Sequence, residues 1–476
     1  MHKFYLLISL LNAVANISFL CIRMKNILLL ILLFPIVVSG QNKIKVYSTQ
    51  PVDTTISTGV NAVYLDRSYD DTLIAYIQRA KYSIDIAVFS YDQYGQMSNI
   101  ANAVNQAQAN GRQVRWIYCG GVGNTGLSLL NSSIPTLASP TSALYAIMHH
   151  KFVIFDANSS DPADAIVFTG SANWNADQIN EDENNLVIIN DQPLAQTYLE
   201  EFNEMWGSTG MTPDTSASRF GPFKTNNTQH YFQVEGKTVE LYFSPSDNTN
   251  SHLINVINSA DNDLNFGVYT FTRPDIADTI VYKINQGVKV TGIMDQYSIG
   301  FNAHTILSPV MGNDLKVFTH PDSIFHSKYM IVDACDPNSD PVVEVGTHNW
   351  TTAAETKNDE NVLIIHDDTL ANIFLQAYKG SFNRLNGVLQ NCPPNSVEEF
   401  FSVISVYPNP AKDFLEIALP LNEILSIQIY SIDGKIIKND IHLNNVIYIS
   451  DLISGWYVMK ITTPKSSYLA KFVKTD

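Results

Sequence analysis

A short pattern of residues that could carry out acid–base and nucleophilic chemistry occurs twice in the chain. The first copy places His149 two positions before Lys151, and the second places His326 two positions before Lys328. Matched residues follow each pair, namely Asp156, Gly170, Ser171 and Asn173 in the first copy and Asp333, Gly346, Thr347 and Asn349 in the second. A duplicated pair with matched followers indicates two half-sites around one reacting group. We expect that group to be a phosphodiester.

The spacing between the two copies is nearly constant. The histidines, the lysines and the aspartates are each 177 positions apart (326 − 149 for the histidines), and the glycines are 176 apart (346 − 170). Glu183-Asn184 and Glu360-Asn361 also lie 177 apart, each before an apolar stretch. This period is much longer than the roughly 20–50 residues of solenoid repeats. The sequence therefore predicts two halves related by duplication.

The residue types fit a two-step displacement at phosphorus. In an extended segment, residues at i and i+2 point to the same face, so each histidine lies beside its lysine. Two such faces, brought together across a pseudo-twofold axis, would hold two imidazoles and two ammonium groups. One imidazole would attack phosphorus, the other would protonate the leaving oxygen and then activate water, and the lysines would stabilise charge. This set requires no metal and no cofactor.

Four polar side chains downstream are candidates to bind the substrate. Asn173 and Asn349 could donate hydrogen bonds to the phosphate oxygens, and Ser171 and Thr347 occupy equivalent places beside them. The hydroxyl group is kept in both copies, so we expect the same role in both halves.

Four carboxylates are candidates for supporting roles. Glu183 and Glu360 are the best candidates to accept a ring N–H, because a carboxylate fixes the histidine tautomer and stabilises imidazolium. Asp156 and Asp333 lie seven positions after their histidines, an odd number, so on a continuous strand they face away from the site. We predict a structural role for these two aspartates.

Other polar residues have simpler interpretations. His150 falls on the opposite face of the strand from His149, so it is expected in the core or at the surface. His348 has no counterpart in the first copy, where Ala172 stands, and a packing or solvated role is favoured. The loops 156–164 and 333–341 are rich in Asp and Asn but lack the ligand periodicity of an EF-hand, so turn chemistry explains them better than calcium.

The flanking sequence predicts the elements that position the site. "TLIAYIQRAKYSIDIAVFSYD" from Thr72 resembles "HLINVINSADNDLNFGVYTFT" from His252, and each predicts a helix feeding a buried strand. "FVIFD" and "YMIVD" after the lysines are apolar and β-branched, which is typical of strands covered by helices on both faces. The predicted fold class is α/β, with two related sandwich halves.

The composition and the polar breaks between apolar segments predict the domain organisation. The chain has 476 residues, of which 45% are hydrophobic, so it can bury sizeable cores. We predict a signal or export segment at 1–40, a first half at 41–218, a second half at 219–390, a linker at 391–400 and a small β-domain at 401–476. Residues 24–40 have the basic start, apolar core and small residues of a signal peptide, so Met24 is the favoured true start.

Charge and cysteine content limit the function classes. The formal net charge of −17 disfavours a long nucleic-acid groove, which needs a basic stripe, but it is compatible with a local cationic pocket. Cys119, Cys335 and Cys392 follow the signal and show no metal-ligand spacing. Cys335 and Cys392 could pair in an oxidising compartment, although buried or free thiols are the favoured interpretation.

The end of the chain resembles a known secretion module. Short alternating runs with a turn at Asp433-Gly434 predict β-hairpins and a small β-sandwich. "VYPNPAKDFLEI" at Val406–Ile417, "GWYVMKI" at Gly455–Ile461 and "KFVK" at Lys471–Lys474 are similar to the C-terminal sorting domain of the type IX secretion system. The resemblance implies export by that machinery to the surface or medium of a Bacteroidetes-type bacterium. A plain β-sandwich contact module is the alternative.

The paired histidine motifs also carry a resemblance. His-x-Lys-x4-Asp with Gly-Ser-x-Asn or Gly-Thr-x-Asn resembles the phospholipase D superfamily over about residues 60–385. The resemblance implies two α/β/α sandwiches that meet at one shared site, and a phosphohistidine intermediate. It implies His149 as the nucleophile and His326 as the acid. Because both half-sites lie in one chain, no obligate oligomer is expected.

The substrate stays open between two classes. The superfamily includes phospholipases and metal-independent endonucleases that use the same residues, and "HSKYMIVD" with its followers looks like the small bacterial endonuclease branch. The acidic composition favours a phospholipid over extracellular DNA or RNA. A non-enzymatic adhesin is disfavoured because both motif copies are intact.

Overall fold

The computed structural model describes residues 42–392 apart from Pro337, together with residues 402–476 apart from 405, 418–425, 432–434, 440–445 and 463–466. The predicted signal segment, its cleavage point and the Asp433-Gly434 turn lie outside the described residues. Within the described ranges, the longest apolar helices fall short of what is needed to cross a membrane.

The first half is built on one eight-stranded mixed sheet. Its strand order is β2-β1-β8-β7-β6-β3-β4-β5. The strands are β1 (Ile44–Ser48), β2 (Val63–Tyr64), β3 (Ser83–Val88), β4 (Gln113–Tyr118), β5 (Thr136–Ala138), β6 (Lys151–Phe155), β7 (Ile166–Gly170) and β8 (Asn185–Ile189). The helices are α2 (Tyr69–Arg79), α3 (Met97–Ala109), α4 (Ala176–Asn180) and α5 (Gln192–Trp206).

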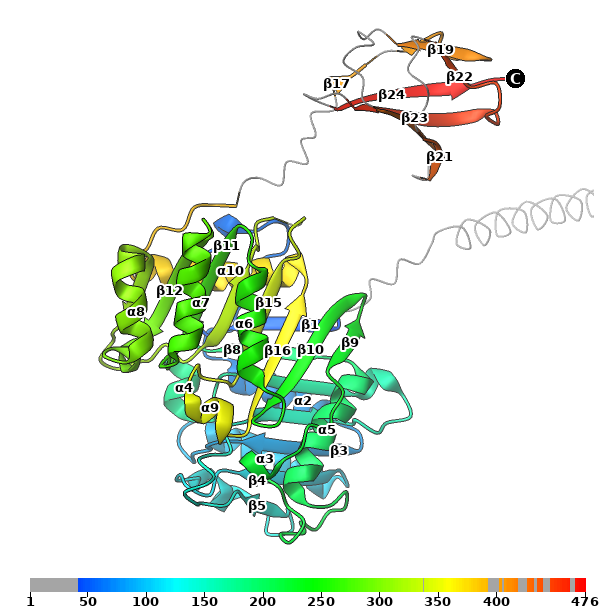
Figure 1. Ribbon diagram of the computed structural model, residues 1–476. Helices are drawn as coiled ribbons and strands as arrows, with labels where there is room; N and C mark the ends of the chain where they lie inside the picture. The colour runs from blue at the N-terminus through cyan, green and yellow to red at the C-terminus, as the bar shows by residue number, and fades with distance from the viewer. Residues whose placement is uncertain are drawn as a thin grey trace, which may run out of the picture.

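The second half repeats this arrangement in a second eight-stranded sheet (Figure 1), with the order β13-β12-β11-β14-β15-β16-β10-β9. The strands are β9 (Tyr231–Val234), β10 (Lys237–Ser244), β11 (Asp263–Val268), β12 (Lys289–Asp295), β13 (Leu315–Phe318), β14 (Lys328–Val332), β15 (Val342–Gly346) and β16 (Glu360–His366). The helices are α6 (Thr249–Ser259), α7 (Pro274–Asn285), α8 (Asn302–Met311), α9 (Thr352–Thr356) and α10 (Asp368–Arg384). The predicted α/β fold class is confirmed.

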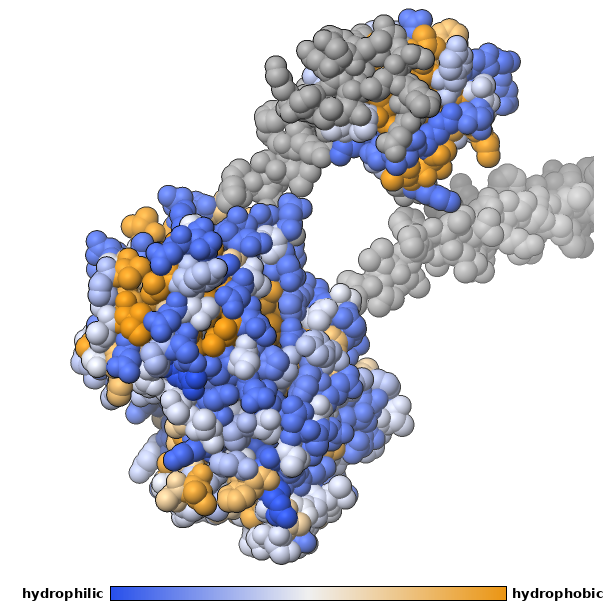
Figure 2. Space-filling model, in the orientation of Figure 1, coloured by the Kyte–Doolittle hydropathy of each residue, from blue (hydrophilic) through white to orange (hydrophobic). Residues whose placement is uncertain are grey.

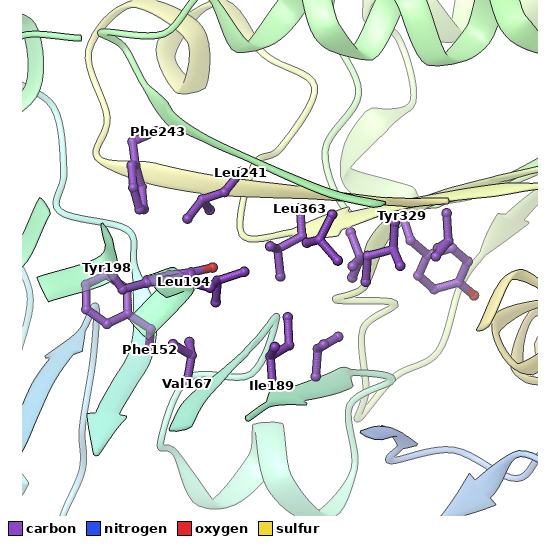
Figure 3. Packing of buried hydrophobic residues seen from close by; sticks show 14 of the residues in the cluster. Phe152, Val167, Ile189, Leu194, Tyr198, Leu241, Phe243, Tyr329 and Leu363 are labelled. Atoms are coloured by element: carbon purple, nitrogen blue, oxygen red, sulfur yellow. The ribbon is translucent and has the colours of Figure 1, made fainter. Parts of the chain in front are cut away.

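The buried hydrophobic residues of the two halves form three clusters. The outer face of the first sheet packs against α2 and α3, and the outer face of the second packs against α6, α7 and α8. The inner faces of both sheets share one central cluster with α5 and α10. Figure 3 shows this cluster, with side chains such as Phe152, Val167 and Ile189 from the first half opposite Leu241, Phe243 and Leu363 from the second. Burial of this shared apolar surface fixes the two halves against each other.

The two central helices start at equivalent aspartates. Asp191 accepts a hydrogen bond from the Leu194 amide at 3.1 Å, and Asp367 accepts one from the Leu370 amide at 2.8 Å. Each carboxylate satisfies an amide that the first turn of the helix leaves unpaired. The two caps are 176 positions apart (367 − 191).

The cysteines depart from the favoured interpretation of free thiols. Cys335 and Cys392 form a disulfide across 57 positions, whereas Cys119 is a buried free cysteine. Cys335 follows β14, so the bond ties the chain after α10 to the second sheet. Sequence separation alone could not show that the two side chains meet in space.

The C-terminal residues form a small β-sandwich, as predicted. One sheet has the order β17-β24-β23-β20-β21 and the other has β18-β19-β22, and apolar residues from both share one core. The strands are β17 (Ser402–Val403), β18 (Val406–Tyr407), β19 (Phe414–Ile417), β20 (Ser426–Ser431), β21 (Ile436–Lys438), β22 (Val446–Tyr448), β23 (Gly455–Thr462) and β24 (Ser467–Lys474).

One carboxyl group is buried without a partner in the second sheet. Glu344 lies in the middle of β15, is fully buried, and neither of its carboxyl oxygens has a hydrogen-bond partner among the described residues. Burial raises the pKa of Glu344 well above its usual value. The folded protein therefore keeps this group protonated at pH values at which the unfolded chain ionises it.

We predict that Glu344→Leu stabilises the protein increasingly as pH rises. Below the unfolded pKa of roughly 4.3 the carboxyl is protonated in both states and contributes no penalty. Above it, the wild type loses about 1.4 kcal/mol of stability per pH unit, up to the folded pKa, and the variant does not. Urea unfolding at pH 4.5, 6 and 7.5 measures the difference. A constant difference between variant and wild type across these pH values would contradict the prediction.

Candidate active site

The two His-x-Lys pairs stand at the start of equivalent central strands. Lys151 is the first residue of β6 and Lys328 is the first residue of β14. His149 and His326 precede these strands, and all four side chains are almost fully buried. Each sheet thus presents one imidazole and one amine at the same edge.

The backbone at each histidine pairs with the opposite half. The His149 amide donates to the Asp359 carbonyl at 2.9 Å, and the His326 amide donates to the Glu183 carbonyl at 3.0 Å. Met148 and Asp359 form a parallel bridge, as do Glu183 and Phe325. The segment before β16 therefore lies beside the first histidine, and the segment before β8 lies beside the second.

Glu360 of the second half holds His149 of the first. The Nδ1 atom of His149 lies 2.6 Å from a carboxylate oxygen of Glu360. Burial would raise the pKa of Glu360, but the His149 ring, with smaller contributions from His348 and Lys151, outweighs it and lowers the pKa to about 2. The carboxylate is therefore ionised and accepts the Nδ1–H. Burial lowers the pKa of His149 to about 4 against the pull of Glu360, so Nε2 keeps its lone pair at neutral pH.

A neutral amide holds the other histidine. The Nδ1 atom of His326 lies 3.0 Å from Oδ1 of Asn184. The amide orientation is fixed on both sides, because Asn184 Nδ2 donates to the Gln178 carbonyl at 2.8 Å and Ser171 Oγ donates to Asn184 Oδ1 at 2.9 Å. Burial, followed by the neighbouring charges of Lys328 and Lys151, lowers the pKa of His326 well below its usual value. The two imidazoles therefore have unlike partners.

Glu183 does not support His326, contrary to the sequence prediction. Its carboxylate accepts hydrogen bonds from Ser381 at 2.5 Å and from Arg384 at 2.7 Å, both on α10. The 177-position match of Glu183 with Glu360 is a coincidence of sequence. The sheets instead keep the 176-position register of Gly170 and Gly346, because both glycines pair with equivalent strands at Leu186 and Val362. In that register Asn184 is the counterpart of Glu360 (360 − 176).

Each lysine is held between its own histidine and an aromatic ring. Lys151 Nζ donates to the His149 carbonyl at 2.7 Å and lies 5.0 Å from the centre of the Phe89 ring. Lys328 Nζ donates to the His326 carbonyl and lies 5.0 Å from the centre of the Tyr269 ring. Burial lowers the pKa of Lys151 to about 7, and burial followed by the charge of Lys151 lowers the pKa of Lys328 well below its usual value. Keeping two ammonium groups buried near one carboxylate costs free energy, because burial disfavours the charged form. A bound anion would offset part of this cost, so the site favours an anionic ligand.

The predicted substrate-binding residues fall into two groups. Asn173 Oδ1 is buried without a partner among the described residues, and Asn349 Oδ1 accepts from the Thr270 amide at 3.2 Å, which leaves its Nδ2 to donate. Ser171 and Thr347 instead lie behind the site. Their hydroxyl oxygens accept the amides of Asn185 and Asn361 at 3.1 and 3.0 Å, so they position the strands rather than face a substrate.

The aspartates of the two motifs bind backbone amides. Asp156, with a positive φ, accepts the amides of 81–83 at 2.7–2.8 Å, and Asp333 accepts those of 261–263 at 2.8–2.9 Å. Each thus holds the turn between a helix and the strand that leads to the site. Among the described residues, neither carboxylate is hydrogen-bonded to a histidine.

A buried ionic network lies behind His149. His150 Nε2 is 2.9 Å from Glu201, and Lys224, from the segment that joins the halves, pairs with Glu201 and lies 3.2 Å from Asp359. Tyr145 also donates to Asp359, at 2.6 Å. All of these side chains are buried. The network fixes Asp359, whose carbonyl holds the His149 amide. His348, also buried, bonds Thr249 at 3.0 Å, away from this network.

We predict that Lys224→Ala destabilises the protein by about 3–5 kcal/mol, because it leaves Glu201 and Asp359 as buried carboxylates without their cation. Denaturant unfolding measures the loss. Lys45→Ala, at a partly exposed position on β1, is the control and should change stability by less than about 0.5 kcal/mol. An equal, small effect of both substitutions would contradict the role of Lys224.

Three residues of the site escaped the sequence prediction. The sequence offset of 177 pairs Asn184 with Asn361, one position away from its structural counterpart Glu360. The helix caps Asp191 and Asp367 lie 176 apart, which is the offset that the two sheets keep. Phe89 and Tyr269 each directly follow a buried strand, β3 and β11, and their rings lie 5.0 Å from the rings of His149 and His326. The sequence does contain a signal for these two residues, because both are aromatic and both occupy the same place in the similar stretches that begin at Thr72 and His252.

Comparison with known proteins places the chain in a family. Residues 73–206 and 253–385 match the family described as "Cardiolipin synthase, PLD-like domain". These segments span more than half of the chain, and they contain both histidine motifs. The chain belongs to the phospholipase D-like family, and its chemistry is of the phosphodiesterase type.

Individual relatives agree with this assignment. A segment is 27% identical over 159 residues to the mitochondrial cardiolipin hydrolase of Xenopus tropicalis, which covers 32% of this chain and 67% of that protein. It is 24% identical to the phospholipase D of Rickettsia typhi, covering 31% and 71%. For several cardiolipin hydrolases the match spans only about half of the relative, as in the human protein at 52%. The crystal structure of phosphatidylserine synthase from Haemophilus influenzae shares the fold, with a TM-score of 0.50 at 14% identity over 66% of this chain and 83% of that one.

The C-terminal sandwich also has a family. Residues 405–475 match the secretion system C-terminal sorting domain. This confirms the resemblance of the end of the chain to a type IX sorting domain and implies secretion or surface localisation in a Bacteroidetes-type bacterium.

Proposed function

We propose that the chain is an exported phosphodiesterase that hydrolyses the head-group phosphodiester of a phospholipid through a phosphohistidine intermediate. The observation that carries the proposal is the pair of buried imidazoles, each bonded through Nδ1 to a side chain of the other half. Two lysines beside them, at Lys151 and Lys328, supply positive charge for the phosphate oxygens. No group of three or more His, Cys, Asp or Glu side chains among the described residues could hold a metal ion.

The unlike partners of the histidines support His149 as the nucleophile. The Glu360 carboxylate orients the Nδ1–H tautomer and would stabilise the positive charge that the ring gains when Nε2 bonds to phosphorus. His326 faces a neutral amide, which stabilises imidazolium less, so its protonated form is the better proton donor.

The reaction then proceeds in two balanced steps. In the first, His149 Nε2 forms a bond to phosphorus, the bond to the leaving oxygen breaks, and His326 gives its Nε2 proton to that oxygen. In the second, His326 takes a proton from water, the hydroxide bonds to phosphorus, and the bond to His149 breaks. Lys151 and Lys328 offset the charge of the non-bridging oxygens, and Asn349 Nδ2 is placed to donate to them.

Two observations support a phospholipid as the substrate. The relatives that the chain matches include proteins with the names cardiolipin hydrolase and phospholipase D. The net charge of −17 opposes the approach of polyanionic nucleic acid. The second candidate function is a metal-independent endonuclease that acts on extracellular DNA or RNA, and the resemblance of "HSKYMIVD" and its followers to the small bacterial endonucleases favours it.

The substrate class is tested by parallel assays in EDTA. We expect the purified protein to hydrolyse phospholipid vesicles and to leave single- and double-stranded DNA intact. His149→Ala and His326→Ala should each lower phospholipid turnover by on the order of 10³-fold or more. Cleavage of DNA without phospholipid hydrolysis would establish the endonuclease instead, and activity that survives both substitutions would refute the site.

The order of roles is tested with a p-nitrophenyl phosphodiester, whose leaving group needs no proton. We expect His326→Ala to release one equivalent of nitrophenolate in a burst and then to stall, because water is no longer activated. His149→Ala should give no burst. A burst in His149→Ala alone would assign the nucleophile to His326.

The pKa values predict an acidic optimum for kcat/KM. His149 must be neutral to attack, so activity falls as pH decreases through about 4, its pKa. Lys151 must be protonated to stabilise charge, and burial lowers its pKa to about 7 against the pull of Glu360, so activity falls as pH rises through about 7. A pH profile with the soluble p-nitrophenyl substrate measures both limbs. A plateau that continues above pH 8 would contradict the role of Lys151.

A further inference from the structure

Two segments beside the active site carry no charged side chain. Residues 116–148 lead from β4 to His149, and residues 296–313 lead from β12 through α8. Neither contains Asp, Glu, Lys or Arg, although the chain as a whole has 46 acidic and 29 basic residues. We call the exposed parts of these two segments the uncharged rim.

The rim presents apolar side chains to solvent. Tyr297, Ile299 and Phe301 are 56%, 52% and 50% exposed, and Leu144 is 67% exposed. Val310 is also exposed, on the outer face of α8. Figure 2 shows apolar surface, in orange, over α8 on the left of the molecule and a second area low on the first half near β4 and β5. Single exposed apolar residues are ordinary, but three within five positions form a patch.

Aromatic contacts connect the rim to the catalytic histidine. The Tyr297 ring lies 5.5 Å from the Tyr269 ring, which lies 5.0 Å from the His326 ring. On the other side, residues 139–148 run directly into His149, and most of 140–146 is exposed. The exposed apolar side chains therefore lie on segments that connect directly to the two histidines, one segment in each half.

The second-half part of the rim is held in place by buried groups. Asp295 accepts the amides of Tyr297 at 3.1 Å and of Phe325 at 2.8 Å, so one carboxylate joins the rim to the residue before His326. Ser298 Oγ donates to the Tyr269 carbonyl at 3.1 Å and accepts the Phe271 amide at 3.0 Å. The apolar tips thus keep a fixed position relative to the site.

The second half builds its part of the rim with an element that the first half lacks. Helix α8 lies between β12 and β13, whereas the segment between β4 and β5 contains only the 3-10 helix at Thr125–Leu129. Ala303, Leu307 and Met311 face the core from α8, and the exposed face is uncharged. The helix is therefore attached to the fold on one side and offers an uncharged surface on the other, where Pro309 and Val310 are exposed together with Asn302 and Thr305.

We propose that the uncharged rim docks on the surface of a phospholipid bilayer and places the site over a lipid head group. The inference rests on the proposed function. Tyr, Phe and aliphatic side chains without charges suit the boundary between head groups and acyl chains. The chain is acidic elsewhere, so docking relies on apolar insertion rather than on attraction to anionic lipid. A nucleic acid would instead need cations on this surface, and the rim has none.

The rim is tested by vesicle binding of the purified full-length protein. The probe is a phosphatidylcholine vesicle, and the protein carries His149→Ala so that no lipid is consumed. We expect Ile299→Asp with Phe301→Asp to lower the vesicle partition coefficient by at least tenfold. Tyr82→Asp is the matched control, because Tyr82 is 55% exposed but precedes β3, at the end of the strand away from the site. This control should bind as the parent does.

A second readout separates docking from chemistry. In the protein with His149 intact, the rim substitutions should lower hydrolysis of vesicles at least tenfold and leave kcat/KM for the soluble p-nitrophenyl phosphodiester within twofold. Ile299→Ser with Phe301→Ser should give a smaller loss in the same direction.

The outcomes distinguish this inference from the proposed function. Equal vesicle binding by the parent, the rim variant and the control would contradict docking through the rim, even if the protein hydrolyses phospholipid. Vesicle binding that depends on the rim supports it, even if hydrolysis of phospholipid is absent and the proposed substrate is wrong. If the rim substitutions abolish binding to single-stranded DNA and leave vesicle binding unchanged, docking of the rim on a bilayer is also contradicted. The rim would then be a surface on which nucleic-acid bases stack.

Discussion

The pairing of each histidine with the opposite half is the constraint on which the rest of the site depends. The amide of His149 is bonded to Asp359 and the amide of His326 to Glu183, so neither imidazole is positioned by its own sheet alone. The shared core, the two capped helices and the Lys224 network all act to keep these two backbone bridges in register. A small rotation of one half would move both histidines from their Nδ1 partners at once.

The electrostatics of the site follow from the same pairing of the two halves. Bringing the halves together buries two lysines and two histidines around one ionised carboxylate, Glu360, and burial lowers the pKa values of the lysines and histidines. A phosphodiester carries the negative charge that this arrangement lacks. Substrate binding would then relieve part of the cost of burial, which is a source of affinity that depends on charge and not on the rest of the lipid or nucleotide.

The sequence predicted those features that can be read from the order of residues along the chain. The repeat spacing predicted two related halves, and the apolar runs directly after Lys151 and Lys328 predicted buried strands. Features that depend on tertiary contacts were not accessible in this way. Glu183 and Glu360 look equivalent in sequence, but strand pairing through Gly170 and Gly346 makes Asn184 the counterpart of Glu360. The Cys335–Cys392 bond likewise depends on where the chain returns after α10.

The unequal partners of the two histidines have a consequence for how such a site can evolve. If two identical chains formed this site, any change at the partner position would appear on both sides of the twofold axis, and the histidines would stay equivalent. Joining the halves in one chain removes that restriction. Position 184 can hold an amide while position 360 holds a carboxylate, and each imidazole can then be selected for a different step of one reaction.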